Sequence, residues 1–144
     1  MLSFDLELND FIMDFKKLVV LGVGNELKSD DGAGPFIIGV NAVLNGTTLK
    51  NNSAINGSGA YVEGNYAVFD NVTALLNNAS STGAGIYVKG NYTNITNSNV
   101  NNNTADDFGA GAYIDGSYAV VDTSNFKYNV AEGFDGLTGP YLSI

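Results

Sequence analysis

The chain has 144 residues, which is enough for one domain or for one domain with an appendage. Its 15 acidic residues outnumber six lysines, arginine is absent, and the formal net charge is −9. This balance disfavours nucleic acids and anionic membrane surfaces as partners, because both are bound through Lys and Arg. Cysteine and histidine are also absent, which excludes disulfides, thiolate metal sites and nucleophiles activated by histidine.

The first element along the chain is the apolar run over residues 18–23, which follows Lys16 and Lys17. It has the order of a signal peptide, but it is short, Asp10 and Asp14 precede it, and no small-residue cleavage site follows. It is also far below the ~18–20 apolar residues that a membrane span requires. We therefore predict a buried strand that runs into a loop, and no membrane span.

A loop rich in glycine and aspartate follows this strand. A dinucleotide-binding turn is disfavoured there, because Leu27 stands where the third glycine belongs. The segments Leu21-Gly-Val-Gly-Asn25 and Asp30-Asp-Gly-Ala-Gly34 resemble the opening of the hydrogenase maturation endopeptidases. That family trims a C-terminal tail from the large subunits of nickel–iron hydrogenases. The resemblance covers residues 18–39 and implies that Asp31 helps to bind the nickel of the substrate.

The rest of that peptidase site is missing from the chain. The family needs a second aspartate on a later strand and then a histidine, whereas this sequence contains no histidine. One carboxylate does not supply the several ligands that a nickel site requires. We therefore assign no catalytic residue and no resident cofactor, and nickel enters only if the chain is this peptidase.

The composition changes near residue 40, and all asparagines except Asn9 and Asn25 come after Gly39. We divide the chain into a truncated peptidase-like segment, 1–40, and a repeat region, 41–144. The alternating apolar residues of the first segment, among them Leu2 and Phe4, predict a cap over the first repeat.

The repeat region has a period of 26 residues. Its glycines, tyrosines and apolar residues recur in register: Gly57, Gly83 and Gly109; Gly59, Gly85 and Gly111; Tyr61, Tyr87 and Tyr113; Val62, Val88 and Ile114; Gly64, Gly90 and Gly116; Tyr66, Tyr92 and Tyr118. An upstream copy extends three rows without an insertion: Val43, Phe69, Ile95 and Val121; Asn51, Asn77, Asn103 and Asn129; Ser53, Ala79, Ala105 and Ala131. The tail leaves the pattern where Leu137 and Gly139 replace the expected Gly and Tyr.

Each repeat predicts two or three short strands with corners at Gly or Asn, because alternation has period 2 and glycine recurs too often for a helix. Stacked turns place equivalent residues ~4.8 Å apart. The fold class is therefore all-β, a right-handed parallel β-helix of about 3.5–4 rungs. The rows containing Ile86 and Val88 should face inward, the tyrosines between them should stack outside, and asparagine ladders should occupy the turns. Lys89 should lie between Glu63 and Asp115, where opposite charges stabilise neighbouring strands.

Residues 83–88 and 109–114, with the Phe126-Lys-Tyr-Asn129 element, resemble the motifs of surface β-helices. That class includes polymorphic outer-membrane proteins and the adhesin-like proteins of methanogenic archaea. The resemblance covers residues 41–131 and implies a structural or adhesive module at a cell surface or outside the cell. A protein or a glycan is then the expected partner, and open rungs permit end-to-end self-association.

Two further features leave alternatives open. Asp70 and Asp122 share a repeat position, and Asp106 and Asp107 lie together, as a polysaccharide-active β-helix enzyme would require of its carboxylates; however, Thr96 separates the first pair. Eight Asn-x-Ser/Thr sequons are acceptors for glycans if the protein is exported, although an Asn- and Thr-rich composition also generates them: Asn45, Asn51, Asn56, Asn71, Asn78, Asn91, Asn94 and Asn102.

Overall fold

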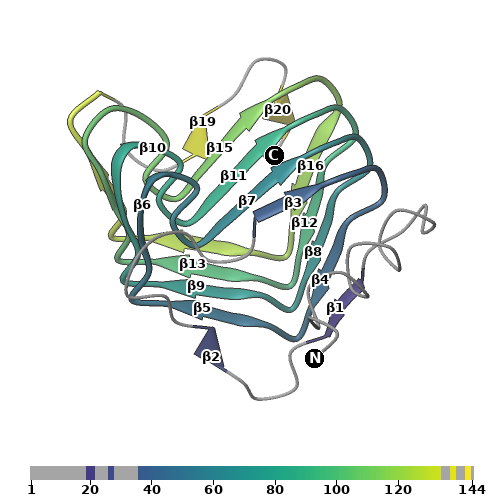
Figure 1. Ribbon diagram of the computed structural model, residues 1–144, viewed down its shortest axis with the longest axis horizontal. Coiled ribbons are helices and arrows are strands. Elements are labelled where there is room, and N and C mark those ends of the chain that lie inside the picture. Colours follow the sequence, from purple (N-terminus) through teal and green to yellow (C-terminus); the bar gives the residue numbers. More distant parts are fainter. Residues whose placement is uncertain (1–18, 22–25, 28–35, 134–136, 139–141, 144) are drawn as a thin grey trace, which may run out of the picture.

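The structure is a computed structural model that describes residues 19–21, 26–27, 36–133, 137–138 and 142–143. All elements in these ranges are β-strands, and their parallel pairing builds four sheets. Successive rungs run clockwise in Figure 1 while the chain recedes from the viewer, so the solenoid is right-handed. The all-β, parallel β-helix prediction is confirmed, with about four turns stacked along one axis.

Each sheet takes one strand from every turn. Sheet A contains β1 (Val19–Leu21), β4 (Val43–Asn45), β8 (Val68–Asp70), β12 (Asn94–Thr96), β16 (Ala119–Asp122) and β20 (Leu142–Ser143). Sheet B contains β2 (Glu26–Leu27), β5 (Thr48–Lys50), β9 (Thr73–Leu75), β13 (Asn99–Asn101) and β17 (Asn125–Lys127). Sheet C contains β3 (Phe36–Ile38), β7 (Ala60–Glu63), β11 (Ile86–Lys89), β15 (Ala112–Asp115) and β19 (Leu137–Thr138). Sheet D contains β6 (Ser53–Asn56), β10 (Asn78–Thr82), β14 (Thr104–Ala105) and β18 (Val130–Ala131).

Each complete turn therefore has four strands, which corrects the expected two or three. The corners explain the difference, because one residue at each corner adopts a left-handed backbone conformation that redirects the chain. We call the turn of β4, β5, β6 and β7 the first turn and that of β8, β9, β10 and β11 the second. In the second turn these residues are Tyr66, Asn71, Leu76 and Gly83. Leu76 and Tyr66 are poor candidates for positive φ on steric grounds, so the sequence did not mark their corners.

Strands β4, β5 and β6 pair with β8, β9 and β10 at an offset of 25 residues rather than 26. The first member of each of the three rows predicted upstream is therefore wrong by one residue. Leu44 pairs with Phe69, and Ala54 pairs with Ala79. A bulge between Ala79 and Thr82 adds one residue to the second turn, and the 26-residue register begins there. The shift has a physical reason: with it, Leu44 is inward and fully buried and Ser53 is exposed, whereas a one-residue slip would exchange the two faces.

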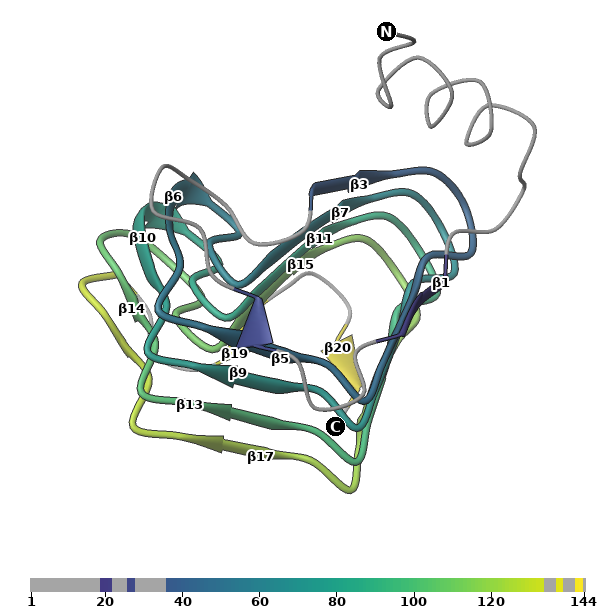
Figure 2. The ribbon, with the colours of Figure 1, turned by 60° about the horizontal axis from the view of Figure 1, so that its bottom comes forward.

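The interior contains two apolar clusters. The larger lies between sheets A, B and C, with Phe69, Ile86 and Ile95 fully buried, and each such side chain contributes about 1.5–3 kcal/mol. The smaller consists of alanines packed inside a narrow arm, which we define as sheet D and the segments returning from it to sheet C: Ala79, Ala84, Ala105 and Ala110. Figure 2 shows the rungs in layers, with the arm projecting on the side of β6 and β10.

A buried asparagine ladder lies where the arm joins the main body. Nδ2 of Asn77 donates to Oδ1 of Asn103, and Nδ2 of Asn103 donates to Oδ1 of Asn129, both at 2.9 Å. The same oxygens accept backbone N–H groups, and a Cβ on Gly59 would approach Nδ2 of Asn77. The expected ladder is thus present at a turn but faces inward, and its first-turn member is Asn52, not Asn51.

Both ends of the described chain remain in the sheets. β1, β2 and β3 pair with β4, β5 and β7, so the strand expected within residues 18–23 is present as Val19–Leu21. β19 and β20 pair with β15 and β16 although the tail departs from the sequence repeat. The division into residues 1–40 and 41–144 stays a prediction. Within the described ranges there is no helix long and apolar enough to cross a membrane.

Candidate functional site

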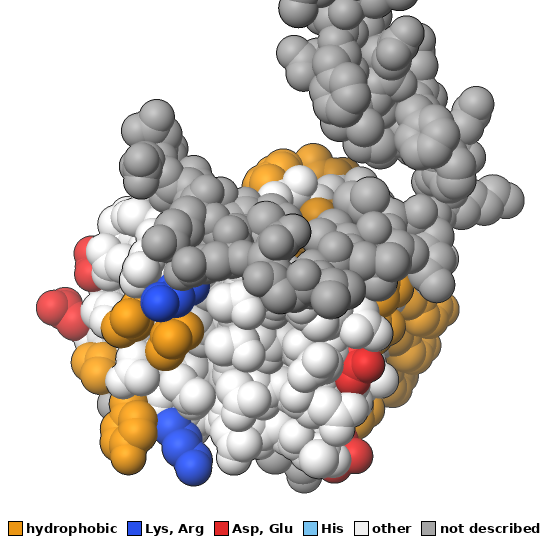
Figure 3. Space-filling view, turned by 90° about the horizontal axis from the view of Figure 1, so that it is seen from below, with side chains coloured by type: hydrophobic (Ala, Val, Ile, Leu, Met, Phe, Trp, Pro, Cys, Tyr) orange, Lys and Arg blue, Asp and Glu red, His pale blue; other side chains and the backbone are white. Residues whose placement is uncertain are grey.

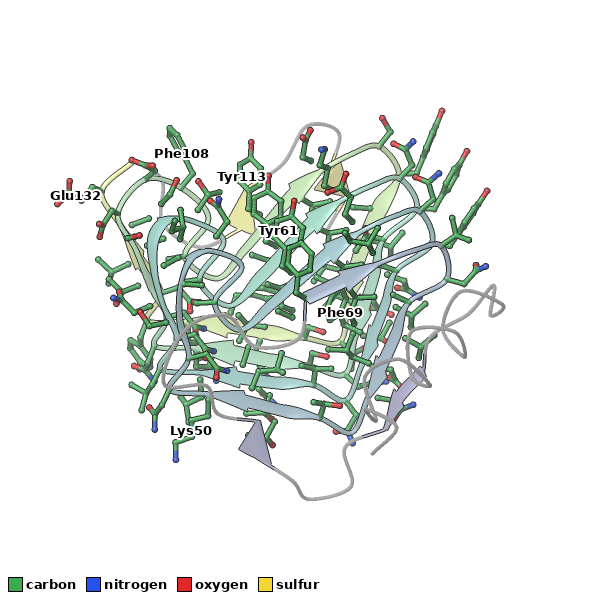
Figure 4. The ribbon with its side chains drawn as sticks, viewed as in Figure 1. Lys50, Tyr61, Phe69, Phe108, Tyr113 and Glu132 are labelled. Carbon is green, nitrogen blue, oxygen red and sulfur yellow. The ribbon has the colours of Figure 1, made fainter. Side chains whose placement is uncertain are left out.

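Tyrosines form a stacked column on the outer surface of sheet C. The ring centroids of Tyr61 and Tyr87 are 4.8 Å apart, and those of Tyr87 and Tyr113 are 5.3 Å apart. Phe36 extends the column at 4.7 Å from Tyr61. Period-2 alternation positions these rings, because the residues on either side of each tyrosine face the core. The expected external tyrosine column is confirmed, and Figure 4 shows Tyr61 and Tyr113 on this face.

A second column follows the corner between sheets C and A. Tyr66, Tyr92 and Tyr118 stack with centroids 4.9 Å apart at both steps. They are 51%, 45% and 66% exposed, and their φ angles are 62°, 60° and 61°. A left-handed backbone costs a residue with a side chain about 1–2 kcal/mol, and the equivalent residue of the first turn is Asn41, which tolerates it better.

The left-handed conformation of these tyrosines was not predicted from sequence. Their 26-residue spacing was visible, and so was the glycine two positions before each of them. No local rule places tyrosine at positive φ, however, so the pattern predicted a recurring row of tyrosines but not their position at a corner. At the corner between sheets B and D the left-handed residue changes from turn to turn, whereas tyrosine persists through three turns here: Asn51, Leu76, Asn102 and Tyr128 occupy the B–D corner.

A polar strip separates the two columns. Lys89 pairs in register with Glu63 on one side and Asp115 on the other, as predicted. Nζ of Lys89 lies 3.1 Å from Oε1 of Glu63, and the Tyr61 hydroxyl donates to Oε2 of Glu63 at 3.3 Å. We call the two tyrosine columns and this strip the tyrosine face. The two columns lie close together, because Tyr61 and Tyr66 are five residues apart in sequence. A fully extended chain advances at most ~3.6 Å per residue, so their Cα atoms are less than about 18 Å apart.

Burial and neighbouring groups raise the pKa values of two phenols in the sheet C column. Desolvation, followed by the charge of Glu63, raises the pKa of Tyr61 above its ordinary value. Desolvation, followed by Tyr61 and Asp115, raises the pKa of Tyr87. The hydrogen bond and charge of Glu63 raise the pKa of Lys89, which stays cationic. The Lys89–Glu63 ion pair therefore lies beside two phenols, Tyr61 and Tyr87, whose pKa values are raised.

The stacking decides which parts of the rings meet a ligand. Tyr87 and Tyr92 have a neighbouring ring on each face, so they present ring edges and hydroxyls to the solvent. Sugar rings bound by aromatic residues usually need a free ring face, which these central tyrosines lack. Hydroxyl edges suit the mixed polar and apolar surface of a protein, where tyrosine is enriched at interfaces.

Two of the four aspartates considered for polysaccharide chemistry, Asp70 and Asp107, accept side-chain hydrogen bonds from neighbouring rungs. Asp70 and Asp122 lie in one column of sheet A with Thr96 between them, as expected. Oδ1 of Asp70 accepts from Nδ2 of Asn97 at 2.8 Å and from the hydroxyl of Thr96 at 3.0 Å, and these bonds lower the pKa of Asp70. Asp107 Oδ2 accepts from the Ser81 hydroxyl in the arm.

The metal assignment falls outside the described part of the chain. Asp31 lies in the segment 28–35, so its role in binding nickel stays a prediction. Among the residues that are described, no three His, Cys, Asp or Glu side chains are grouped to hold a metal ion. Comparisons with known protein families, known proteins and solved structures find no match to this chain.

Proposed function

We propose that this chain is a structural and adhesive surface module, without catalytic activity, that binds a protein partner through the tyrosine face. The observation that supports this role most strongly is the corner column Tyr66, Tyr92 and Tyr118. Three successive turns retain an exposed tyrosine in a backbone conformation that glycine or asparagine would adopt at lower cost. Backbone strain of this kind is concentrated at functional positions.

The rest of the tyrosine face supports a protein as the partner. Its rings are rigid, amphipathic and only partly buried, which allows large contact area at low entropic cost. The strip between the columns carries Glu63, Lys89 and Asp115, so polar groups accompany the aromatic contacts. A stacked glycan is less well matched, because the central rings lack free faces.

A display experiment tests this proposal with the full chain. The biotinylated protein is exposed to a random-peptide display library and, separately, to a glycan array. Enriched peptides should lose about ten-fold in affinity, ~1.4 kcal/mol, when Tyr92 is changed to Asn or Tyr87 to Ala, as expected for interface hot spots. Asn99→Ala, on the outer surface of sheet B, is the matched control and should leave binding unchanged.

Two results would contradict the proposal. If only glycans are captured, the partner class is wrong. If peptide binding is the same in the tyrosine variants as in the parent chain, the tyrosine face is not the binding site. Circular dichroism of each variant establishes that the strand content is retained before affinities are compared.

A further inference from the structure

The eight sequons are not equivalent in the folded chain. N-glycosylation requires the asparagine amide at the acceptor position and a Ser or Thr hydroxyl two residues later. Both groups must be reachable at the surface for a folded chain to be an acceptor. Each sequon can therefore be judged by the accessibility of two groups, the asparagine amide and the hydroxyl.

Four asparagines have amides that are held or buried by the fold. In three of them the side chain is hydrogen-bonded to a neighbouring rung, and in the fourth the amide oxygen is buried. Nδ2 of Asn45 donates to Oδ2 of Asp70 (3.2 Å), Oδ1 of Asn56 accepts the Thr82 N–H (3.2 Å), Oδ1 of Asn91 accepts the Ser117 N–H (2.8 Å), and Oδ1 of Asn94 is buried.

The hydroxyls of the same four sequons are also withheld. Three belong to residues that are at most 1% exposed: Thr47, Ser58 and Thr93. The Ser58 hydroxyl donates to the Ala84 carbonyl at 2.7 Å, and the Thr96 hydroxyl donates to Asp70 at 3.0 Å. The amide and the hydroxyl therefore exclude the same four sequons as glycan acceptors, those of Asn45, Asn56, Asn91 and Asn94.

The remaining four sequons satisfy both requirements. Their asparagines are exposed, and the structure describes no side-chain hydrogen bond for them: Asn51, Asn71, Asn78 and Asn102. Their hydroxyl residues Ser53, Ser80 and Thr104 are exposed and Thr73 is half-buried. Three of these asparagines have φ angles of 53–56°, which place them at the apex of a corner: Asn51, Asn71 and Asn102.

These four positions share one side of the molecule. Asn51 and Asn102 lie at the corner between sheets B and D, Asn78 is on the outer surface of sheet D, and Asn71 is at the corner between sheets A and B. None is on sheet C, whose outer surface carries the tyrosines. Figure 3 shows the outer surface of sheet B, which these corners border and where uncharged polar side chains predominate.

We propose that Asn51, Asn71, Asn78 and Asn102 are N-glycosylation sites, and that their glycans cover the side of sheets B and D while the tyrosine face stays bare. The donor is an oligosaccharide linked through pyrophosphate to a polyprenyl lipid. The asparagine Nδ2 forms a bond to the anomeric carbon, the bond from that carbon to the pyrophosphate oxygen breaks, and the lipid pyrophosphate leaves with the electron pair. A base of the transferase takes the amide proton.

The test uses the folded full chain, a purified single-subunit oligosaccharyltransferase and a lipid-linked oligosaccharide, followed by glycopeptide mapping. Glycan is expected at the four exposed sequons and not at Asn45, Asn56, Asn91 or Asn94. Free peptides spanning Asn45 and Asn91 should accept glycan, because the fold no longer withholds their hydroxyls. Ser53→Ala and Thr104→Ala should abolish modification at Asn51 and Asn102 only.

Two outcomes would overturn the proposal. One is the absence of glycan from all sites of the folded chain while the free peptides are modified. The other is modification spread over all eight sequons. Neither outcome depends on whether the tyrosine face binds a protein, so this test and the display experiment fail separately.

Discussion

Tyr92 and Tyr87 are both tyrosines stacked between two others, yet the fold treats them differently. Tyr87 is half-buried on a strand, whereas Tyr92 is 45% exposed at a corner with φ of 60°. Stacking of aromatic pairs contributes about 0.5–1.5 kcal/mol beyond burial. At Tyr92 this gain is offset by backbone strain, so stacking should stabilise the folded chain more at Tyr87 than at Tyr92.

Replacing each of these two tyrosines with asparagine should reveal this difference in stability. Tyr92→Asn should change the free energy of unfolding by less than about 1 kcal/mol, because asparagine relieves strain as stacking is lost. Tyr87→Asn should destabilise by about 2–4 kcal/mol, because burial and two stacking contacts are lost without relief. Urea unfolding measures the free energy of unfolding of both variants. An equal loss of stability in the two would contradict the difference predicted between Tyr87 and Tyr92.

The phenols of sheet C also predict how stability depends on pH. The pKa values of Tyr61 and Tyr87 are raised above 10.0, so above that pH the unfolded chain releases protons that the folded chain retains. Stability should therefore be independent of these groups below pH 10 and should fall as the pH rises further. Lys89, whose pKa is also raised, acts in the same direction.

Urea midpoints measured through this alkaline range test the effect. The double variant Tyr61→Phe/Tyr87→Phe should lose less stability with rising pH than the parent, because Phe has no proton to release. An unchanged slope in the double variant would show that other groups cause the alkaline loss.

At the scale of the element, stacking was predictable from sequence where repeats align without interruption. The inward rows of Ile86 and Val88 and the outer row of Tyr87 follow from 26-residue spacing and alternation. The bulge after Ala79 was not predictable, because it adds one residue inside a run of small polar residues that suits either register. The fourth strand was missed because Leu76 gave no sign of a corner.

The candidate site, like the fold, could be predicted from the sequence only in part. Both tyrosine rows and the Glu63, Lys89 and Asp115 row were visible in the 26-residue spacing, and the structure stacks each of them as a column on successive rungs. Burial of the asparagine ladder was not predictable, because asparagine is normally exposed and its inward position depends on glycines from another part of the rung.

The asparagine ladder should make a large contribution to stability. Asn103→Ala removes the acceptor of the Asn77 N–H and Nδ2 groups and the donor to the Ala74 carbonyl, all of them buried. Each buried group left without a partner costs about 1–3 kcal/mol, so a loss of at least ~3 kcal/mol is expected. The exposed Asn99→Ala on the same rung should change stability by less than about 0.5 kcal/mol. Similar values for the two variants would rule out the buried ladder.

At the scale of the whole molecule, every feature above depends on rungs stacked in register. From Tyr61 and Asn77 onward, the tyrosine columns, the charge row and the asparagine ladder each join residues 26 positions apart, and the core is continuous only because inward rows coincide. A solenoid of this kind is stabilised mainly between neighbouring turns. Its surfaces are consequently ladders of equivalent side chains, with the tyrosine face on one side and the four exposed sequons on the other.

The most direct test of this register uses disulfide formation, since the chain has no native cysteine. Lys89→Cys/Asp115→Cys places two thiols on directly paired residues of β11 and β15. Their Cα atoms should lie ~4.8 Å apart, within the range that a disulfide permits. The control Lys89→Cys/Tyr113→Cys is offset by two residues and separates the Cα atoms by about 8 Å, beyond that range. Mild oxidation should crosslink the first pair and leave the control as free thiols; equal crosslinking of both pairs, or of the control alone, would contradict the stacked solenoid.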